Sequence, residues 1–363
     1  MMKILALTKY SYEGPSSRYR FYNYKKCFEK DGIKLMISPL FDSKYFKEKS
    51  KYKKIQIVIF SYIKRIKQIL KLLTKNSYDL VLIEYELLPY FPAFFEKILN
   101  KRGIKYIVDY DDAIFHKYDL HKNSLIRYLL KNKIPTVMKN ATHIIACNQY
   151  LEDFAKRYNK NITRLPTVVL LDKYKEKMKN HKKRDDKYII GWIGSKTTSV
   201  YVLDIMDILI KFLDHHEDVE LHLVGFDKPL LEKKGIKNKK IKVFQWKEEE
   251  EIDRILDFDV GIMPLRDTPW SKGKCGFKLI QYMSCKKPVI ASPVGINSSI
   301  VENGKNGYLV KHKNDWYGLL ENIFYLSKNN IGNKGFEKIL DEFNYDKNCE
   351  KYINLVKNQV IDV

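Results

Sequence analysis

Long apolar runs are absent from this chain of 363 residues. No uninterrupted apolar stretch reaches the roughly 18 residues that a membrane-spanning helix needs, so no membrane span is expected. The run Ile4-Leu5-Ala6-Leu7 is too short for a signal peptide and predicts a first strand. Because 45% of the residues are hydrophobic and the chain is long for a single core, we expect two folded domains.

Cysteine is scarce and odd in number, with five residues at wide spacings. No pair has zinc-finger spacing, and an odd count excludes complete disulfide pairing within one chain. A reducing cytosol fits this usage best, so a cytoplasmic protein is expected. We interpret Cys275 as a small packing residue because no base stands near it in the sequence. The five are Cys27, Cys147, Cys275, Cys285 and Cys349.

Acidic residues and arginine are both under-represented. The chain has 67 Lys and Arg against 44 Asp and Glu, a formal charge of +23, and ten of the 67 are arginine, which leaves 57 lysines. Arginine is favoured for base recognition, whereas lysine is a hydrated point charge. No nucleic-acid partner is therefore expected. Two interpretations of the lysine excess stay open. The lysines are scattered over the surface without a common partner, or they bind a polyanion or an anionic membrane surface.

Short apolar runs alternate with helix-length segments along the chain. This order predicts an α/β fold with two doubly wound, Rossmann-like domains, each with a parallel sheet. The charged stretch 172–187 lacks apolar periodicity and is expected to be a linker. The expected parts are an N-terminal domain at 1–171, that linker, a C-terminal domain at 188–344 and a final helix at 345–363. The strands expected in the N-terminal half are Lys3 to Leu7, Lys34 to Ser38, Leu80 to Ile83, Tyr106 to Asp109 and His143 to Ala146.

Two glycine-containing loops in the C-terminal half have the composition of phosphate-binding loops. One is the run 271–276, SKGKCG, which leads into a helix carrying Lys278 and Gln281. The other is 191–198, GWIGSKTT, between an expected strand and an expected helix. Such loops present backbone N–H groups, hydroxyls and lysines to an anion. Ordinary helix caps have the same composition, so either loop alone leaves both interpretations open.

The stretch 276–309, GFKLIQYMSCKKPVIASPVGINSSIVENGKNGYL, resembles the donor-site signature of retaining, nucleotide-sugar-dependent glycosyltransferases of the GT-B fold, the group 1 or family 4-like enzymes. That signature reads as a glutamate-bearing helix, then PVIAS, G, E-x-V and G-x-x-G-x-L. Here Gln281 stands at the second glutamate, and the first falls at Gly273 or Lys274. Both carboxylates of the usual pair are absent, although a glutamine amide can hydrogen-bond ribose hydroxyls.

The resemblance implies a sugar transfer from a nucleoside-diphosphate sugar, a substrate rather than a cofactor, to an acceptor in a cleft between the two domains. It implies retention of configuration without a metal, and a last helix that crosses back to the N-terminal domain. Lys278 is the expected stabiliser of leaving-group charge, and Trp246 and Gln281 are expected near the nucleoside. The residues expected around the diphosphate are Gly194, Ser195, Lys196, Thr197, Thr198 and Lys274.

The N-terminal half offers two polar clusters after expected strands. Arg18 follows the first strand in the run 9–20, KYSYEGPSSRYR, where relatives have a glycine-rich loop, and it suits a phosphate or an acidic acceptor. Asp111 and Asp112 follow the strand that begins at Tyr106, and we expect them to face the transferred sugar or the acceptor. An Asp-x-Asp motif that holds a divalent metal is the alternative.

The segment Ile55 to Leu73 has apolar residues at helical spacing, with basic residues on the opposite side at Lys64, Arg65, Lys67, Lys71 and Lys75. A domain helix packed on its sheet is one interpretation. A surface that rests on anionic lipid, beside a lipid-linked acceptor, is the other.

The expected function is glycosyl transfer in cell-surface glycan or glycolipid synthesis, with the protein cytoplasmic or peripheral on the inner face of the membrane. A sugar-nucleotide epimerase of the same fold is one alternative. A non-catalytic protein that binds nucleotide sugars or polyanions is another, because the glutamate pair is missing.

Overall fold

The computed structural model describes residues 1–363 apart from 76, 183–185, 326–329 and 362–363. The chain forms two compact units. The first contains Met1–Thr167, Gly273–Cys275 and Asp346–Val363, and the second contains Val168–Lys272 and Gly276–Tyr345. These units group the residues discussed below, while the domain boundaries expected at 171, 187 and 344 remain predictions.

The first unit is built on a parallel six-stranded sheet in the order β2-β1-β3-β4-β5-β6. Five of its strands were predicted; the sixth, β6, has only three residues on the sheet edge. The chain leaves β1 toward β2 and then returns to its other side with β3, which makes the sheet doubly wound. The strands are β1 (Lys3–Tyr10), β2 (Lys34–Phe41), β3 (Leu80–Glu84), β4 (Tyr106–Tyr110), β5 (His143–Ala146) and β6 (Ile162–Arg164).

Helical segments connect these strands. They are α1 (Pro15–Ser17), the π-helical turn Arg18–Tyr22, α2 (Lys25–Lys30), α3 (Ser43–Lys47), α4 (Lys51–Thr74), α5 (Phe94–Lys101), α6 (His116–Asp119), α7 (Ser124–Leu130), α8 (Lys133–Asn140), α9 (Gln149–Ala155) and the terminal α20 (Tyr345–Ile361). None of the helices in the described ranges is both long and apolar enough to cross a bilayer.

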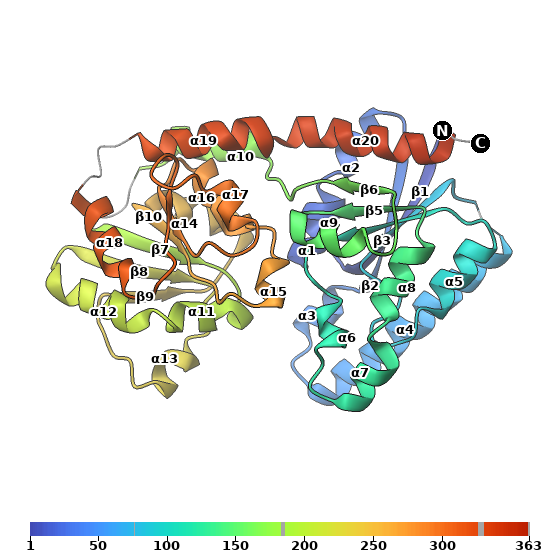
Figure 1. Ribbon diagram of the computed structural model, residues 1–363, viewed down its shortest axis with the longest axis horizontal. Helices are drawn as coiled ribbons and strands as arrows, with labels where there is room; N and C mark the ends of the chain where they lie inside the picture. The colour runs from blue at the N-terminus through green and yellow to red at the C-terminus, as the bar shows by residue number, and fades with distance from the viewer. Residues whose placement is uncertain (76, 183–185, 326–329, 362–363) are drawn as a thin grey trace. The chain divides into compact units, whose positions relative to one another are not determined.

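The terminal helix α20 packs against α2 within the first unit (Figure 1). The Tyr352 ring lies edge-on to the rings of Tyr24 and Phe28, at centroid distances of 5.1 and 5.2 Å. Lys357 Nζ lies 2.6 Å from Asp31 Oδ2. Aromatic packing and this ion pair therefore hold the last described residues on the first unit.

The second unit has a parallel sheet in the order β12-β11-β10-β7-β8-β9. It is doubly wound as well, which confirms the predicted fold class. The strands are β7 (Tyr188–Ile193), β8 (Val219–Val224), β9 (Ile241–Phe244), β10 (Val260–Met263), β11 (Val289–Ala291) and β12 (Tyr308–Leu309). The helices are α10 (Leu171–Asn180), α11 (Ser199–Leu203), α12 (Met206–His215), α13 (Pro229–Lys233), α14 (Glu251–Asp257), α15 (Pro269–Lys272), α16 (Phe277–Ser284), α17 (Asn297–Ile300), α18 (Asp315–Tyr325) and α19 (Ile331–Glu342), with 3-10 turns at Lys196–Thr198 and Glu248–Glu250.

Alternation along β7 and β10 separates the two faces of this sheet. Ile190, Trp192, Val260 and Ile262 join one core cluster with residues of α12 and α18. The intervening glycines face the other way: a methyl group on Gly191 would lie 2.0 Å from the Phe258 ring, and one on Gly261 would lie 2.4 Å from the Tyr282 ring. Glycine in these strands therefore lets the aromatic rings beneath the sheet pack closely.

Part of the predicted linker is helical, and its role as a linker between domains remains a prediction. The helix α10 covers Leu171–Asn180 and buries Leu171 and Tyr174. Lys177 Nζ lies 2.7 Å from Asp253 Oδ2 of α14, so part of the charge is paired across two helices. Two buried residues one turn apart are too few to produce a periodic pattern in the sequence. Part of the expected linker, 183–185, lies outside the described residues.

Arg65 does not lie on the solvent face of α4, as its neighbours Lys64 and Lys67 do. The Arg65 side chain is buried, and its Nη2 donates to the carbonyl oxygens of Thr8 and Ser38, each at 2.9 Å. Burial lowers the pKa of the Arg65 guanidinium to about 10. The placement of Arg65 among the exposed basic residues was therefore wrong, because unsatisfied carbonyls of β1 and β2 need a buried donor.

Four of the five cysteines lie in close pairs within the first unit. Disulfides join Cys27 to Cys349 and Cys147 to Cys275, with Cα separations of 6.5 and 5.9 Å. Cys285 is unpaired and buried. The interpretation of Cys275 as an isolated packing residue was wrong, because the fold brings Cys147 beside it from 128 positions away. In a reducing compartment these pairs would lie side by side as thiols.

We expect Arg65→Ala to lower the free energy of unfolding by about 2–3 kcal/mol, because it leaves two buried carbonyl oxygens without their donor. Urea unfolding followed by circular dichroism measures the change. Lys64→Ala, on the exposed face of the same helix, is the matched control and is expected to cost less than about 0.5 kcal/mol. Equal losses in the two variants would contradict the structural role of Arg65.

Candidate functional site

The loop after β7 has the geometry expected of a ligand-binding turn. Ser195 begins the 3-10 turn Lys196–Thr198 with a capping box, in which Thr198 Oγ1 accepts from Ser195 N at 3.1 Å. Ser195 Oγ lies 3.0 Å from Thr197 Oγ1. Ser195, Lys196 and Thr197 are exposed. The residues therefore cap a helical turn and still present hydroxyls and an ammonium group to solvent.

The helix α16 brings Lys278 to this loop. A methyl group on Gly194 would lie 2.9 Å from Lys278 Cε and 2.4 Å from the Trp192 ring, so only glycine leaves room for the lysine. Lys278 Nζ lies 5.5 Å from the centroid of the Trp192 ring. The two loops that the sequence marks as phosphate candidates thus contribute Gly194 and Lys278 to one place, at the carboxyl end of β7.

Tyr282, one turn after Lys278, fixes α16 beneath the sheet. Its hydroxyl accepts a hydrogen bond from Ile193 N at 3.0 Å, and its ring fills the space below Gly261. Burial raises the pKa of the Tyr282 hydroxyl well above its ordinary value. Tyr282 therefore stays neutral and holds the end of β7 in register with α16.

Trp246 lies after β9, close to the same loop. A methyl group on Gly225 would lie 2.2 Å from the Gly194 carbonyl oxygen and 3.3 Å from Trp246 Cβ. Gly225 also has a φ of +75°, a conformation that side chains rarely adopt. Trp246, Gly225 and Gly194 therefore lie next to one another at the carboxyl ends of neighbouring strands.

Gln281 lies in the interior and is only 3% exposed. Its Nε2 donates to Glu251 Oε1 at 2.7 Å, and Trp246 Nε1 donates to Glu251 Oε2 at 2.6 Å. Glu251 thus joins Gln281 and Trp246, the two residues that we expect near the nucleoside. Glu251 begins α14, and its carboxylate is buried between these two donors.

Lys274 is placed in the first unit, together with Gly273 and Cys275. Its Nζ lies 3.8 Å from Asp112 Oδ1, and its carbonyl oxygen accepts from Asn148 Nδ2 at 3.0 Å. The contact that the structure gives Lys274 is therefore to a carboxylate predicted for the acceptor side. Its contact with the donor diphosphate remains a prediction.

The three aspartates around the end of β4 have different surroundings. Asp109 is buried and paired with Arg20 at 3.0 Å, so this pair is part of the core rather than of a ligand site. Asp111 accepts a hydrogen bond from the Tyr85 hydroxyl. Among the described residues, no group of three His, Cys, Asp or Glu side chains comes together as a metal site. The sugar-facing role of Asp111 and Asp112 and the metal alternative both remain untested.

The Arg18 side chain is buried, at 3% exposure. Its guanidinium lies over the rings of Tyr12 and Tyr19, at 5.4 and 5.0 Å from their centroids. Such stacking shields the charge from water on the apolar faces. The predicted contact of Arg18 with an anionic group stays a prediction.

Glu84, at the end of β3, was not recognised from the sequence. Its Oε2 accepts from Lys9 N at 2.7 Å and from Ser17 Oγ at 2.6 Å, and the side chain is buried. Burial raises the pKa of the Glu84 carboxyl to about 7, against the opposing effect of these hydrogen bonds. The Glu84 carboxyl therefore changes charge near neutral pH, at the place where the end of β3 contacts Lys9 of β1 and Ser17 of α1.

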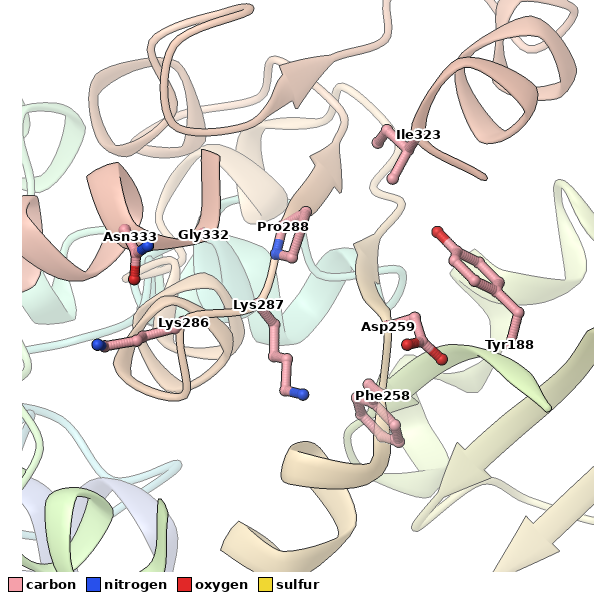
Figure 2. A pocket seen from close by; sticks show the side chains of 9 residues that line it. All are labelled: Tyr188, Phe258, Asp259, Lys286, Lys287, Pro288, Ile323, Gly332 and Asn333. Atoms are coloured by element: carbon pink, nitrogen blue, oxygen red, sulfur yellow. The ribbon is translucent and has the colours of Figure 1, made fainter. Parts of the chain in front are cut away.

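A separate cavity of about 290 Å³ lies at the end of the second sheet opposite to the loop 194–198 (Figure 2). Tyr188 begins β7, and Asp259 and Pro288 immediately precede β10 and β11, so the cavity opens at the amino ends of these strands. Its lining is completed by Phe258, Lys286, Lys287, Ile323, Gly332 and Asn333. Gly194 lies at the carboxyl end of β7, so this cavity is distinct from the loop site.

Residues 187–329 match the family model described as glycosyl transferases group 1. This range contains Gly194, Lys278, Trp246 and Gln281, the residues placed above in the second unit. Over this range the chain is therefore similar to group 1 glycosyltransferases. No curated protein matches the chain in sequence.

Solved structures show that the chain has the GT-B fold. HepE of Anabaena, in complex with UDP-glucose, has a TM-score of 0.71 at 14% identity over 99% of this chain and 100% of that chain. Sucrose-phosphate synthase of Thermosynechococcus elongatus has a TM-score of 0.70 at 14% identity over 99% of both chains. A glycosyltransferase of Rickettsia africae has a TM-score of 0.68 at 17% identity over 100% of this chain and 99% of that chain. Enzymes of this family take nucleoside-diphosphate sugars as donors.

We expect Gly225→Ala to weaken the binding of a nucleoside diphosphate to this protein at least tenfold, because the new methyl group would displace the Gly194 carbonyl. Isothermal titration with UDP, GDP, ADP and TDP measures the change for the tightest binder. The control is Gly235→Ala, which also has a positive φ, +66°, but meets nothing within 4 Å. Equal losses in both variants would assign the effect to backbone strain instead.

We expect the stability gained by Glu84→Gln to grow with pH. A carboxyl whose folded pKa lies near 7, above the ordinary 4.5, stabilises the fold below pH 4.5 and loses that contribution as pH rises to about 7. The variant should therefore exceed the wild type by up to about 3 kcal/mol at pH 8, and by much less at pH 5. Urea unfolding at both pH values tests this, with exposed Glu29→Gln as control. A pH-independent difference would contradict it.

Proposed function

We propose that this glycosyltransferase transfers a sugar from a nucleoside-diphosphate donor to a glycan or lipid-linked glycan acceptor, with retention of configuration, in cell-surface glycan or glycolipid synthesis. The observation that carries the proposal is the contact of Lys278 with Gly194 inside the family-matched range. We assign donor binding to the second unit and acceptor binding to the first.

The donor diphosphate would lie against the loop 194–198. Backbone N–H groups and the hydroxyls of Ser195, Thr197 and Thr198 would donate to its oxygens, and Lys196 would add charge. Trp246 would offer its face to the base, held in orientation by its hydrogen bond to Glu251. Gln281 would then act on the ribose through its Oε1 atom, since its Nε2 is engaged with Glu251.

In the proposed reaction the bond between the anomeric carbon and the phosphate oxygen breaks, and a bond to the acceptor hydroxyl oxygen forms on the same face. The acceptor proton passes to the departing phosphate. Negative charge develops on that phosphate, and Lys278 is placed to stabilise it. No protein nucleophile is required for this sequence.

UDP-sugars are the first donors to test, because the similar structure of HepE contains UDP-glucose. On the acceptor side, Asp111 and Asp112 are proposed to contact hydroxyls of the transferred sugar or the acceptor. Arg18 is proposed to add positive charge for an acidic group. The protein is proposed to act in the cytoplasm or on the inner face of the membrane.

The two alternatives predict different products. A sugar-nucleotide epimerase would convert the donor into a new nucleotide sugar without an acceptor. A non-catalytic binder would bind nucleotides but show no turnover with any acceptor, and the missing glutamate pair is the feature that favours it. Chromatography of donor reactions with and without an acceptor panel separates all three.

We expect Lys278→Ala to reduce turnover about 100-fold, because it removes charge stabilisation that acts as the phosphate departs. Release of UDP from UDP-sugars measures the change, and the melting temperature is expected to stay within a few degrees of the wild type. Lys305→Ala, an exposed lysine of the same unit, is the matched control. Near-normal turnover in Lys278→Ala would refute the role. If Lys278→Ala does not fold, the turnover of Lys278→Met is measured in its place.

A further inference from the structure

Large apolar side chains are exposed mainly in three segments of the first unit. Among the described residues, 14 of the 18 such side chains lie at 46–70, 90–94 and 120–129, whereas the second unit contributes Tyr325 alone. A soluble surface normally scatters such residues singly. The concentration in one unit therefore points to a partner for that surface.

The helix α4 has three sectors along its length. Ile69, Leu72 and Arg65 are buried. A second apolar stripe is exposed at Ile55, Ile59, Ile63 and Leu70, a spacing that places these side chains on one face of a helix. Lysines occupy the adjoining exposed sector at Lys53, Lys64, Lys67 and Lys71. Packing on the sheet explains the buried sector only, so the exposed stripe needs a separate explanation.

The other two segments adjoin α4 through direct contacts. The Tyr62 hydroxyl of α4 donates to the Pro89 carbonyl oxygen at 2.7 Å, beside exposed Tyr90 and Phe91. The Tyr90 ring lies 6.3 Å from the His121 ring, at the loop that leads into α7. The apolar side chains exposed on and before α7 are Leu120, Leu125, Tyr128 and Leu129. The three segments therefore form one connected surface, here called the docking surface.

The charge of the docking surface has one sign almost throughout. Residues 46–75 contain nine lysines and Arg65, with Glu48 as the one acidic residue among them. Lys122, Arg127 and Lys131 are exposed beside the apolar residues of α7. Asp119, the acidic residue of that loop region, is paired with His116 at 2.9 Å. Apolar and aromatic side chains fringed by lysine match the boundary of a bilayer with anionic headgroups.

We propose that the docking surface binds a bilayer rich in anionic lipid. Aromatic and aliphatic side chains of α4, the loop 90–94 and α7 enter the headgroup boundary, and the flanking lysines contact lipid phosphates. A second copy of this chain is disfavoured as the occupant, because it would bring the same lysines face to face. The inference deepens the proposed function, since such a surface would serve a lipid-linked acceptor.

Vesicle sedimentation tests the proposal and requires neither donor nor acceptor, so its result is independent of the proposed transfer reaction. The full chain is mixed with vesicles of phosphatidylcholine alone or of equal parts phosphatidylcholine and phosphatidylglycerol. We expect binding to the anionic vesicles to be at least tenfold tighter, and to weaken in 0.5 M salt.

Matched variants separate the docking surface from general basic charge. Tyr128→Ser is compared with Tyr325→Ser, because these tyrosines are 74% and 71% exposed. We expect the double variant Ile59→Ser, Tyr128→Ser to bind anionic vesicles at least tenfold more weakly, with Tyr325→Ser unchanged. Circular dichroism confirms that these variants, altered only at exposed positions, remain folded.

Charge reversal gives the second comparison. The triple variant Lys53→Glu, Lys64→Glu, Lys67→Glu is expected to lose binding, whereas an equal reversal in the second unit, Lys233→Glu, Lys237→Glu, Lys239→Glu, is expected to retain most of it. The proposal is overturned if the wild type fails to bind anionic vesicles or if both triples lose binding equally. It is also overturned if sedimentation shows a dimer that Ile59→Ser, Tyr128→Ser dissociates, because the occupant would then be a second copy.

Discussion

The packing of α16 under the second sheet is the constraint on which the proposed donor site depends. Tyr282 occupies the space left by Gly261 and accepts a hydrogen bond from Ile193 N, at the last residue of β7. One turn earlier on the same helix, Lys278 lies against Gly194. A single helix thus aligns the end of a strand and brings Lys278 to the adjoining loop. Larger residues at either glycine would separate these elements.

Buried carboxylates in both units are stabilised by hydrogen-bond donors or by a paired cation. Glu251 receives hydrogen bonds from Trp246 and Gln281, and Asp109 is paired with Arg20. Each carboxylate joins segments that are distant in sequence. Breaking such a pair would leave one buried charge without compensation, which is costly. These contacts therefore orient the neighbouring site residues more firmly than surface ion pairs could.

The lysine excess is not distributed like the apolar surface. Exposed lysines occur in both units, whereas exposed large apolar side chains gather on the first. Net charge by itself is satisfied by any anion, so the proposed bilayer contact rests on the combination of lysine with an exposed apolar stripe on α4. The buried sector of α4 packs within the first unit, and the proposed lipid contact lies on its exposed side.

Local pattern was enough for the strands, the doubly wound order and the two glycine loops, because burial periodicity and turn chemistry are written in neighbouring residues. The same reasoning placed Arg65 on the exposed basic side of its helix, and it gave no sign of Gly225 or of the Cys147–Cys275 pair. Each of these depends on what a distant segment places beside it.

The sequence by itself determined the alternation of strands and helices, the lysine excess and the family signature around Lys278. Only the tertiary structure decided which polar side chains are buried and which apolar ones are exposed, and that Lys278 meets Gly194 while Gln281 turns to Glu251. The physical reason is that burial and hydrogen-bond partners are properties of packed elements. Spacing along the chain fixes which face a residue occupies but not what covers that face.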